Sequence, residues 1–160
     1  MSNETYPMTI DGYNKLKEEL DQLKRFDRLS IVKEIEVARA HGDLKENAEY
    51  HAAKERQGFL EGEMRELEDK ISRAQVIDPS TLSGDRVVFG ATVTLLNLDT
   101  DEEVTYSIVG VEEADVKKGT ISYQSPIARG LISKEEGDEV VVQVPGGART
   151  YEIVEVSFGD

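Results

Sequence analysis

Three carboxylates, Asp43, Glu46 and Glu49, crowd into the segment His41–Tyr50, which makes it the part of the sequence best suited to chemistry. Like charges this close on a helix repel one another, and a helix start needs only one cap. Carboxylate oxygens are the ligands that hard cations such as Mg(II) prefer, and Mg(II) takes six of them in octahedral geometry. Asp43 and Glu46 would therefore form only half of a metal site, to be completed by a partner.

The same residues have a purely structural alternative. Asp43 followed three residues later by Glu46 resembles a capping box, in which two side chains satisfy the free backbone amides at the start of a helix. Gly42 would supply the turn before that helix. The spacing by itself favours this alternative, and the sequence leaves both open.

Other side chains near this segment carry weaker signals. His41 and His51, the only histidines, lack the spacing of a zinc site or a catalytic base, so a solvated surface position is favoured for both. Arg39 and Lys54 flank the acidic segment. Charged helix faces are usually just solvated, and contact with nucleic acid is the alternative.

The second half of the chain offers no catalytic set of its own. Ser125 and Pro126 predict the start of a short helix, because Ser is a favoured N-cap and Pro fits the first helical position. No Ser-His-Asp combination and no glycine-rich phosphate loop can be assembled there. An autonomous enzyme is therefore not expected.

Two helices must position the acidic segment. Thr9 is a favoured N-cap type, and the apolar stripe that follows it loses register at 26–30, where Asp27 falls on the apolar face. We expect a stutter or a local bend there. The first stripe contains Tyr13, Leu16, Leu20, Leu23, Ile31, Ile35 and Ala38, and the second contains Tyr50, Ala53, Gln57, Leu60, Met64, Leu67, Ile71 and Ala74.

The second stripe alternates spacings of three and four without exception, which is typical of a coiled coil. Because the turn at 41–43 is short, the two helices must lie antiparallel to hide their stripes. Helices of about 28 to 30 residues make a rod roughly 40 to 45 Å long. The acidic segment is expected at the end of this rod.

After residues 78–84, which have the Pro, Ser and Gly composition of a linker, the apolar period changes to two. This pattern predicts a mainly antiparallel β domain with one short helix, and so an α+β fold overall. Turns are expected at 99–103 and 145–147, and β-bulges at Leu95-Leu96 and Ile153-Val154. The predicted strands carry Val93, Leu95, Val104, Tyr106, Ile108, Val140, Val142, Val144, Tyr151 and Ile153.

Composition and charge restrict the possible partners. The net charge is -14, with 13 basic and 17 acidic residues in 1–75 and 6 basic and 16 acidic residues in 76–160. Duplex binding draws most of its free energy from Lys and Arg on phosphates, so no autonomous duplex binding is expected. There is no Cys, and we find no apolar stretch of membrane-spanning length. A soluble, cytoplasmic chain is the expectation.

Several stretches together resemble one protein family. The run from Ala40 to Glu55 is similar to the signature of the Gre family of bacterial transcript-cleavage factors, and the likeness extends over nearly the whole chain. Further matching stretches are Pro7-Met8-Thr9, Val88–Val93, Ser125–Arg129 and Pro145-Gly146-Gly147. The resemblance implies an N-terminal coiled-coil hairpin (1–77), a linker (78–84) and an FKBP-like β domain (85–160). It also implies that the hairpin enters the secondary channel of a backtracked RNA polymerase while the β domain docks at the rim of that channel.

The resemblance also implies roles for individual residues. Asp43 and Glu46 would be the acidic pair that helps to hold a shared Mg(II) in the polymerase, with no cofactor bound stably by the chain alone. The reaction would be endonucleolytic hydrolysis of the nascent RNA 3′ segment. Arg39 and Lys54 would lie along the RNA, and the docking segment would contain Ser125, Pro126, Ile127 and Ala128. The sparse basic residues near the tip resemble the A type of the family more than the B type.

Two other classes of function compete with this one. A factor that occupies the polymerase channel without cleavage would not need Asp43 and Glu46. A chaperone or prolyl isomerase would need an apolar, aromatic-lined pocket. The second half has no Trp and few aromatic residues for such a pocket, several of them needed for the core: Phe89, Tyr106, Tyr123, Tyr151 and Phe158.

Overall fold

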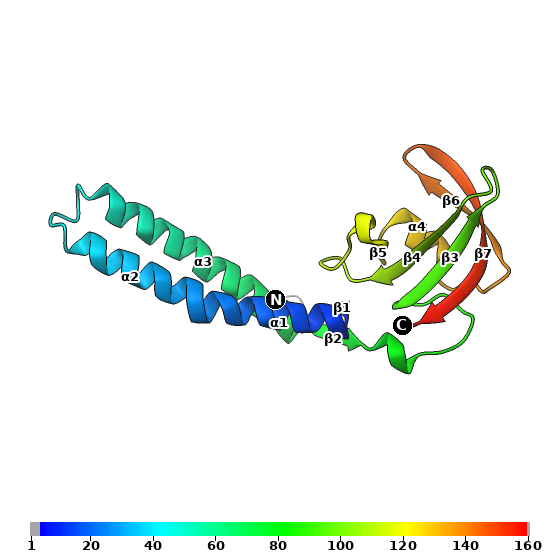
Figure 1. The fold of residues 1–160 in the computed structure, drawn as a ribbon, viewed down its shortest axis with the longest axis horizontal. Coiled ribbons are helices and arrows are strands. Elements are labelled where there is room, and N and C mark those ends of the chain that lie inside the picture. The colour runs from blue at the N-terminus through cyan, green and yellow to red at the C-terminus, as the bar shows by residue number, and fades with distance from the viewer. Residues whose placement is uncertain (1–3, 160) are drawn as a thin grey trace. The chain divides into compact units, whose positions relative to one another are not determined.

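The structure, a computed structural model, describes residues 4–159 (Figure 1). The chain packs as two compact units. The first is built from Tyr13–Ala74, and the second from Thr5–Gly12 together with the chain from Gln75 onward. The linker predicted at 78–84 contains a short 3-10 helix, η2 (Pro79–Thr81), and its role as a domain boundary stays a prediction. Within the described residues, no helix is both long and apolar enough to cross a membrane.

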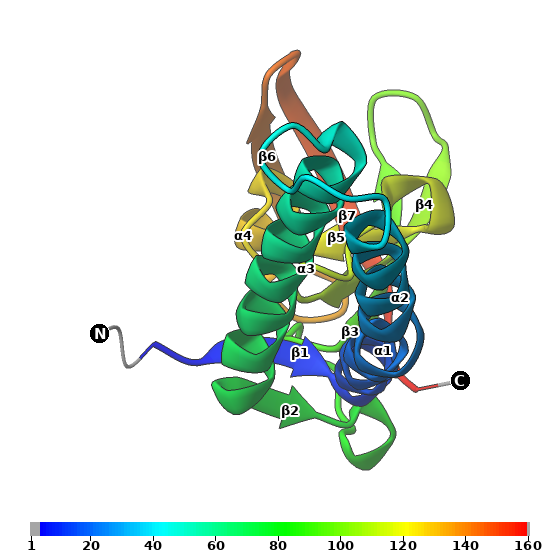
Figure 2. The ribbon, with the colours of Figure 1, turned by 90° about the vertical axis from the view of Figure 1, so that its left-hand side faces the viewer.

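The first unit is the predicted antiparallel helical hairpin. One arm consists of α1 (Ile10–Gln22), the π-helix η1 (Leu23–Asp27) and α2 (Arg28–Arg39), and the other arm is α3 (Ala48–Ser72). Figure 2, viewed along the hairpin, shows the two arms side by side. Their seam buries the predicted apolar stripes, with a core of Leu23, Leu60, Met64 and Leu67 and the partly buried Leu16, Leu20 and Ile31 packed against it.

The first helix starts where the sequence predicts, and the second helix ends earlier than predicted. The Thr9 hydroxyl accepts a hydrogen bond from the amide of Gly12 at 3.2 Å, which confirms Thr9 as the cap of the first helix. At the other end, α3 stops at Ser72 with Arg73 as its C-cap. The expectation that Ala74 continues the second stripe is therefore wrong, because Ala74 is already in strand β2 (Ala74–Ile77).

The stutter predicted at 26–30 is a π-helical turn. Because the backbone hydrogen bonds of a π-helix span five residues and those of an α-helix span four, η1 absorbs one extra residue and restores the apolar phase. Asp27 consequently turns out to solvent, and Arg28 faces the other arm instead. The Arg28 guanidinium makes two hydrogen bonds to the Glu61 carboxylate, at 3.0 and 2.9 Å. The hydrogen bond to Glu61 raises the pKa of Arg28.

The second unit is a curled sheet with a short helix on one face. The strand order is β5 (Thr120–Ser122), β4 (Glu103–Val109), β3 (Ala91–Asn97), β7 (Gly147–Phe158) and β6 (Glu139–Val144). Only β4 and β5 pair in parallel. The 3-10 helix η3 (Val116–Lys118) precedes β5, and α4 (Pro126–Leu131) packs against β6. Strand β1 (Tyr6–Thr9) pairs with β2 in a separate two-stranded sheet.

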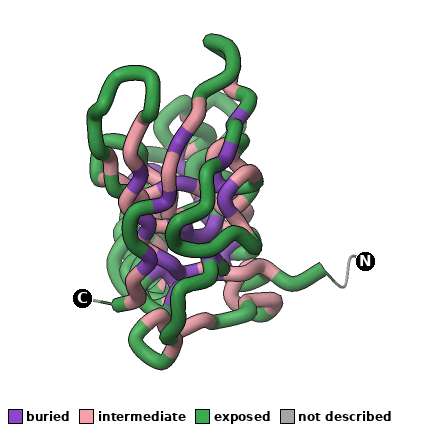
Figure 3. Tube along the Cα trace, turned by 90° about the vertical axis from the view of Figure 1, so that its right-hand side faces the viewer, coloured by how far each residue is buried: buried purple, intermediate pink, exposed green. Residues whose placement is uncertain are grey.

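The core of the second unit confirms the predicted alternation. Figure 3 shows buried positions recurring along the strands. The buried residues are Val87, Ala91, Val93, Leu95, Ile108, Ile121, Ala128, Leu131, Val140, Val142, Tyr151, Ile153 and Val156. The α+β fold predicted from the two apolar periods is therefore confirmed.

One of the two predicted bulges is present. Between β3 and β7, Thr94 pairs with Glu155 and Leu95 with Ile153, so Val154 is the extra residue. This confirms the bulge at Ile153-Val154. The bulge predicted at Leu95-Leu96 is wrong, because both residues pair with β4 in unbroken register. Leu96 is simply a partly exposed apolar residue on the outer face.

Candidate functional site

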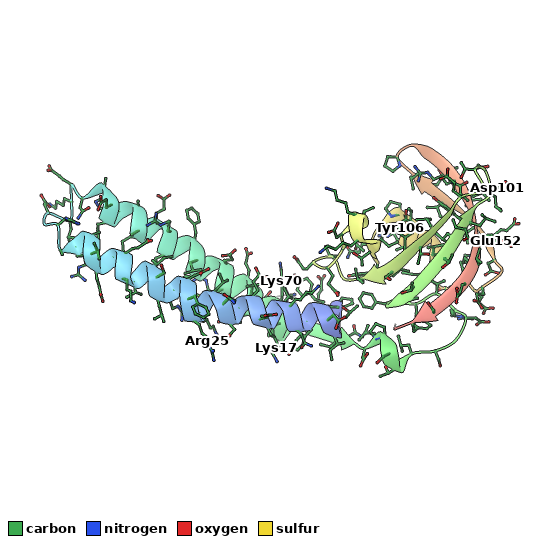
Figure 4. All side chains as sticks on the ribbon, viewed as in Figure 1. Lys17, Arg25, Lys70, Asp101, Tyr106 and Glu152 are labelled. Carbon is green, nitrogen blue, oxygen red and sulfur yellow. The ribbon has the colours of Figure 1, made fainter. Side chains whose placement is uncertain are left out.

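The acidic tip, defined here as the loop 40–47 between α2 and α3, closes the hairpin at the end away from the first turn of α1 (Figure 1). Gly42 has φ of +115°, a backbone conformation that favours glycine at this turn. Residues 41–46 are all exposed, including Asp43 and Glu46. Figure 4 shows side chains projecting from this loop. Both candidate carboxylates are thus accessible to a partner.

Asp43 does not cap the second helix. Its Oδ1 accepts a hydrogen bond from the amide of Lys45 at 3.0 Å, which closes a local turn within the loop. The N-cap of α3 is Asn47, with an extended backbone and Oδ1 accepting from the amide of Tyr50 at 3.0 Å. The capping-box explanation of the Asp43 and Glu46 spacing is therefore wrong. Within residues 4–159, the Glu46 carboxylate has no hydrogen bond or ion pair.

The two carboxylates fit an incomplete cation site. No cluster of three or more His, Asp or Glu side chains within residues 4–159 is arranged to hold a metal ion. Glu46 offers uncommitted oxygens, and Asp43 retains one oxygen beyond the Lys45 amide. Oxygen donors of this kind suit Mg(II), which normally also takes water, phosphate or other protein groups. The metal role of Asp43 and Glu46 stays a prediction.

The histidines and cations predicted near the tip lie where the sequence suggested. His41 is exposed in the loop, and His51 Nε2 lies 3.0 Å from the carbonyl oxygen of Lys45. Arg39 is exposed in the last turn of α2. Lys54 is exposed on α3, where its Nζ donates to Gln57 Oε1 at 3.2 Å. His51 thus supports the backbone of the loop rather than standing free.

Sequence reasoning missed Asn47. Its Oδ1 caps α3, and its Nδ2 donates to the carbonyl oxygen of Ala38 in α2, so one side chain contacts both arms of the hairpin. The signal that could have identified it is the preference for Asn immediately before a helix, here the helix that starts at Ala48. The spacing of Asp43 and Glu46 predicted a helix start before Asn47 instead.

The docking segment predicted in the second unit forms the start of α4. Ser125 is its N-cap: Oγ accepts from the amide of Ala128 at 3.3 Å and donates to the carbonyl oxygen of Ser122 at 2.7 Å. Pro126 is exposed, Ile127 is half-buried, and Ala128 is fully buried in the core. Of these four residues, Pro126 offers the most accessible surface, while Ala128 holds the helix to the sheet.

Comparison with known proteins assigns both units to one family. Residues 6–76 match the N-terminal model of the transcription elongation factors and residues 82–158 match the C-terminal GreA/GreB model. The chain is 62% identical over 154 residues to the transcription elongation factor GreA of Desulfotalea psychrophila, covering 96% of each chain. It is 60% identical over 153 residues to GreA of Halorhodospira halophila, covering 95% of this chain and 97% of that one.

Solved structures also match this chain. They include Gfh1 of Thermus aquaticus, with 25% identity, a TM-score of 0.44 and coverage of 98% of this chain and 99% of that one. A GreA/GreB factor of Nitrosomonas europaea has 21% identity, a TM-score of 0.42 and coverage of 96% and 99%. The family models and the close relatives settle the assignment by themselves. The chain belongs to the GreA/GreB family of transcription elongation factors, and its near relatives are of the GreA type.

Proposed function

We propose that this elongation factor inserts its acidic tip into the secondary channel of a backtracked RNA polymerase and stimulates Mg-dependent endonucleolytic cleavage of the nascent RNA 3′ segment. Arrested complexes would then resume synthesis from the new 3′ end. The observation that carries the proposal is the exposure of Asp43 and Glu46 in a loop at the end of a stiff two-helix arm. The polymerase is the catalyst, and this chain is its accessory.

For RNA cleavage, the main contribution of this chain would be to position Asp43 and Glu46 in the polymerase. Mg(II) shared with the polymerase would steady the attacking and leaving oxygens of the phosphodiester. Asp43 and Glu46 would supply carboxylate oxygens to that site and accept a hydrogen bond from the attacking water, which orients it. The Glu46 carboxylate has no competing intramolecular partner among the described residues, so it is available for this role. The hairpin keeps both groups clear of its own core.

Other surfaces would hold the complex together. Arg39 and Lys54 flank the tip on the two arms and would contact the phosphates of the extruded RNA. The exposed Pro126 at the start of α4 would be part of the surface that docks at the channel rim. Since these contacts serve binding, they should affect the concentration at which the factor acts more than the maximal rate.

The test uses backtracked elongation complexes, Mg(II) and three variants that each change a carboxylate to an amide. Asp43→Asn and Glu46→Gln should each lower the saturating rate of RNA cleavage at least 100-fold while the half-saturating factor concentration changes little. Glu63→Gln, an exposed position on α3, is the matched control and should cleave like the wild type. Cleavage at the wild-type rate by both tip variants would refute the metal role and leave a channel-binding regulator without cleavage activity.

A further inference from the structure

We propose that Asn47 is the positioning residue of the acidic tip: its side-chain amide ties the end of α2 to the start of α3 and so fixes the loop that presents Asp43 and Glu46. This inference rests on the proposed function and adds a residue to its machinery. Asn47 itself is not expected to touch Mg(II) or RNA. It acts through the backbone that carries the two carboxylates.

The geometry of Asn47 is that of a bridge between the arms. Its Oδ1 accepts from the amide of Tyr50 in the first turn of α3 at 3.0 Å. Its Nδ2 donates to the carbonyl oxygen of Ala38 in the last turn of α2. The first amides of a helix lack intrahelical partners, and Asn47 satisfies one of them, the amide of Tyr50. The Ala38 carbonyl also accepts from the His41 amide at 3.1 Å, so Asn47 adds a second, side-chain donor to the end of α2. Asn47 is also half-buried, whereas residues 41–46 are all exposed.

The rest of the loop has few other restraints. Residues 41–46 contribute no side chain to the apolar core of the hairpin, although Leu44, at 37% exposure, is partly covered. The amides of His41 and Gly42 donate to the carbonyl oxygens of Ala38 and Arg39 at 3.1 and 3.3 Å, which holds the start of the loop to α2. Beyond Gly42, the contacts are the turn closed by Asp43 and the approach of His51 to the carbonyl oxygen of Lys45 at 3.0 Å. Asn47 follows Glu46 directly, so the bridge sets where the Glu46 backbone starts. An unrestrained loop would sample many conformations, each carrying the carboxylates to a different place.

The residue type is the second part of the argument. Ser, Thr and Asp cap helices about as well as Asn, because each offers an oxygen to a free amide. Asn offers an amide donor in addition to that oxygen. Replacing the amide by a carboxylate would set an oxygen against the Ala38 carbonyl, and replacing it by a hydroxyl would shorten the reach. Capping and bridging can therefore be separated by substitution.

The experiment compares Asn47→Ser and Asn47→Asp with Asn47→Ala and the wild-type full chain. Helicity by circular dichroism checks the cap, which Ser and Asp retain. Stimulated cleavage of backtracked complexes is then measured across factor concentrations, which separates the half-saturating concentration from the saturating rate. Asn47→Ser and Asn47→Asp should keep wild-type helicity and half-saturating concentration. Both should lose at least tenfold in saturating rate, because misplacement by about 1 Å costs on the order of 100-fold.

Raising the Mg(II) concentration gives a second readout that a merely structural role would not move. A loosely held carboxylate pair should need more Mg(II) for half-maximal cleavage, so the Ser and Asp variants should recover part of their rate at high Mg(II). A wild-type saturating rate for both variants would overturn the proposal. So would an effect confined to the half-saturating concentration, which would indicate binding instead of positioning.

Asp43→Asn, measured in the same assay, separates the two hypotheses. If Asp43→Asn is inactive while Asn47→Ser and Asn47→Asp cleave normally, the proposed function stands and the positioning role of Asn47 is refuted. If Asp43→Asn and Glu46→Gln both cleave normally, the proposed function fails, and the role of Asn47 in it fails as well.

Discussion

The Glu113 carboxylate connects two distant segments of the second unit, at Thr9 and at Gly110. It accepts hydrogen bonds from the amide of Thr9 at 3.0 Å, from the amide of Gly110 at 2.9 Å, and from the Thr9 hydroxyl. The carboxylate fits because two of its neighbours, Gly12 and Gly110, have no side chain: a Cβ added at Gly12 would meet the Glu113 carboxyl carbon at 2.2 Å. This single residue attaches the segment Thr5–Gly12 to the second unit.

Replacing Glu113 by Gln should lower the free energy of unfolding by about 1–3 kcal/mol, because the amide group cannot accept from all three donors and leaves some of them unsatisfied. Denaturant titration of the full chain measures this. Glu102→Gln makes the same chemical change at an exposed position and should stay within about 0.5 kcal/mol of the wild type. Equal stabilities for the two variants would mean that the contacts of Glu113 contribute nothing net.

The sequence predicts correctly that the acidic segment is exposed, but it does not predict the hydrogen-bond partners of individual side chains. The accessible acidic segment followed from the apolar stripes that end on either side of it. The capping role offered for Asp43 failed, because Asn47 lies closer to the true helix start and its side chain reaches both arms. Partners such as Thr9 and Glu113 are 104 positions apart, and no local pattern connects them. Hydrogen bonds between distant residues depend on the fold and are not encoded in spacing.

At the scale of elements, η1 shows how the hairpin accommodates one surplus residue. Upstream of it the seam positions fall at Leu16, Leu20 and Leu23, and downstream they resume with Arg28 and Ile31. Removing one residue from η1 would turn the arm into a continuous α-helix with spacings of three and four throughout. The π-helix is therefore the physical form of the phase slip seen in the sequence.

Deleting Phe26, whose side chain is 61% exposed in η1, should leave the melting temperature unchanged or raised, because every seam residue keeps its partner. Deleting Lys33 instead should destabilise the hairpin by at least about 2 kcal/mol, because it rotates Ile35 and Ala38 away from the seam. Thermal unfolding followed by circular dichroism compares them. Similar losses from both deletions would contradict this account of η1.

Two glycines within α3 weaken that helix without an evident packing reason. A Cβ added at Gly58 would meet nothing within 4 Å, and one at Gly62 would meet only the Arg65 side chain at 3.8 Å. Alanine restricts the unfolded chain more than glycine and favours the helix. Each glycine therefore lowers the free energy of unfolding of the isolated protein relative to alanine at the same position.

Gly58→Ala and Gly62→Ala should each raise the free energy of unfolding by about 0.5–1 kcal/mol. Gly12→Ala is the contrasting control: it also lies in a helix, but the new methyl group would collide with Glu113, so it should be destabilising. Denaturant midpoints measure all three. A loss of stability at Gly58 or Gly62 would show that the space beside them is occupied in the folded protein.

At the scale of the whole molecule, the two halves of the chain differ in net charge. Residues 76–160 carry 16 acidic and only 6 basic side chains. A surface of this kind repels phosphates, so the second half is not expected to bind nucleic acid.

The free protein should leave the fluorescence anisotropy of a labelled DNA duplex unchanged up to about 10 µM protein at about 150 mM salt, because it cannot neutralise enough phosphates to release counterions. A basic DNA-binding protein serves as the positive control. Salt-dependent binding by this chain in the low micromolar range would show that a local cluster of cations outweighs the net charge.

Much of the fold followed from the sequence because each half has its own apolar period. Alternating spacings of three and four predicted the seam of the hairpin, and the period of two predicted the strands and the bulge at Val154. Strand order, the parallel pairing of β4 with β5 and the pairing of β1 with β2 could not be predicted, since they depend on contacts between distant segments.

The pairing of β1 with β2 means that the chain leaves the second unit and returns to it through two hydrogen-bonded neighbours. In the order of the chain, residues 13–74 are therefore an insertion within the second unit. Arms of other lengths, or tips bearing other side chains, can then be exchanged at the same junctions without rebuilding the sheet. The length of the hairpin and the side chains at its tip can therefore change without a change in the β domain.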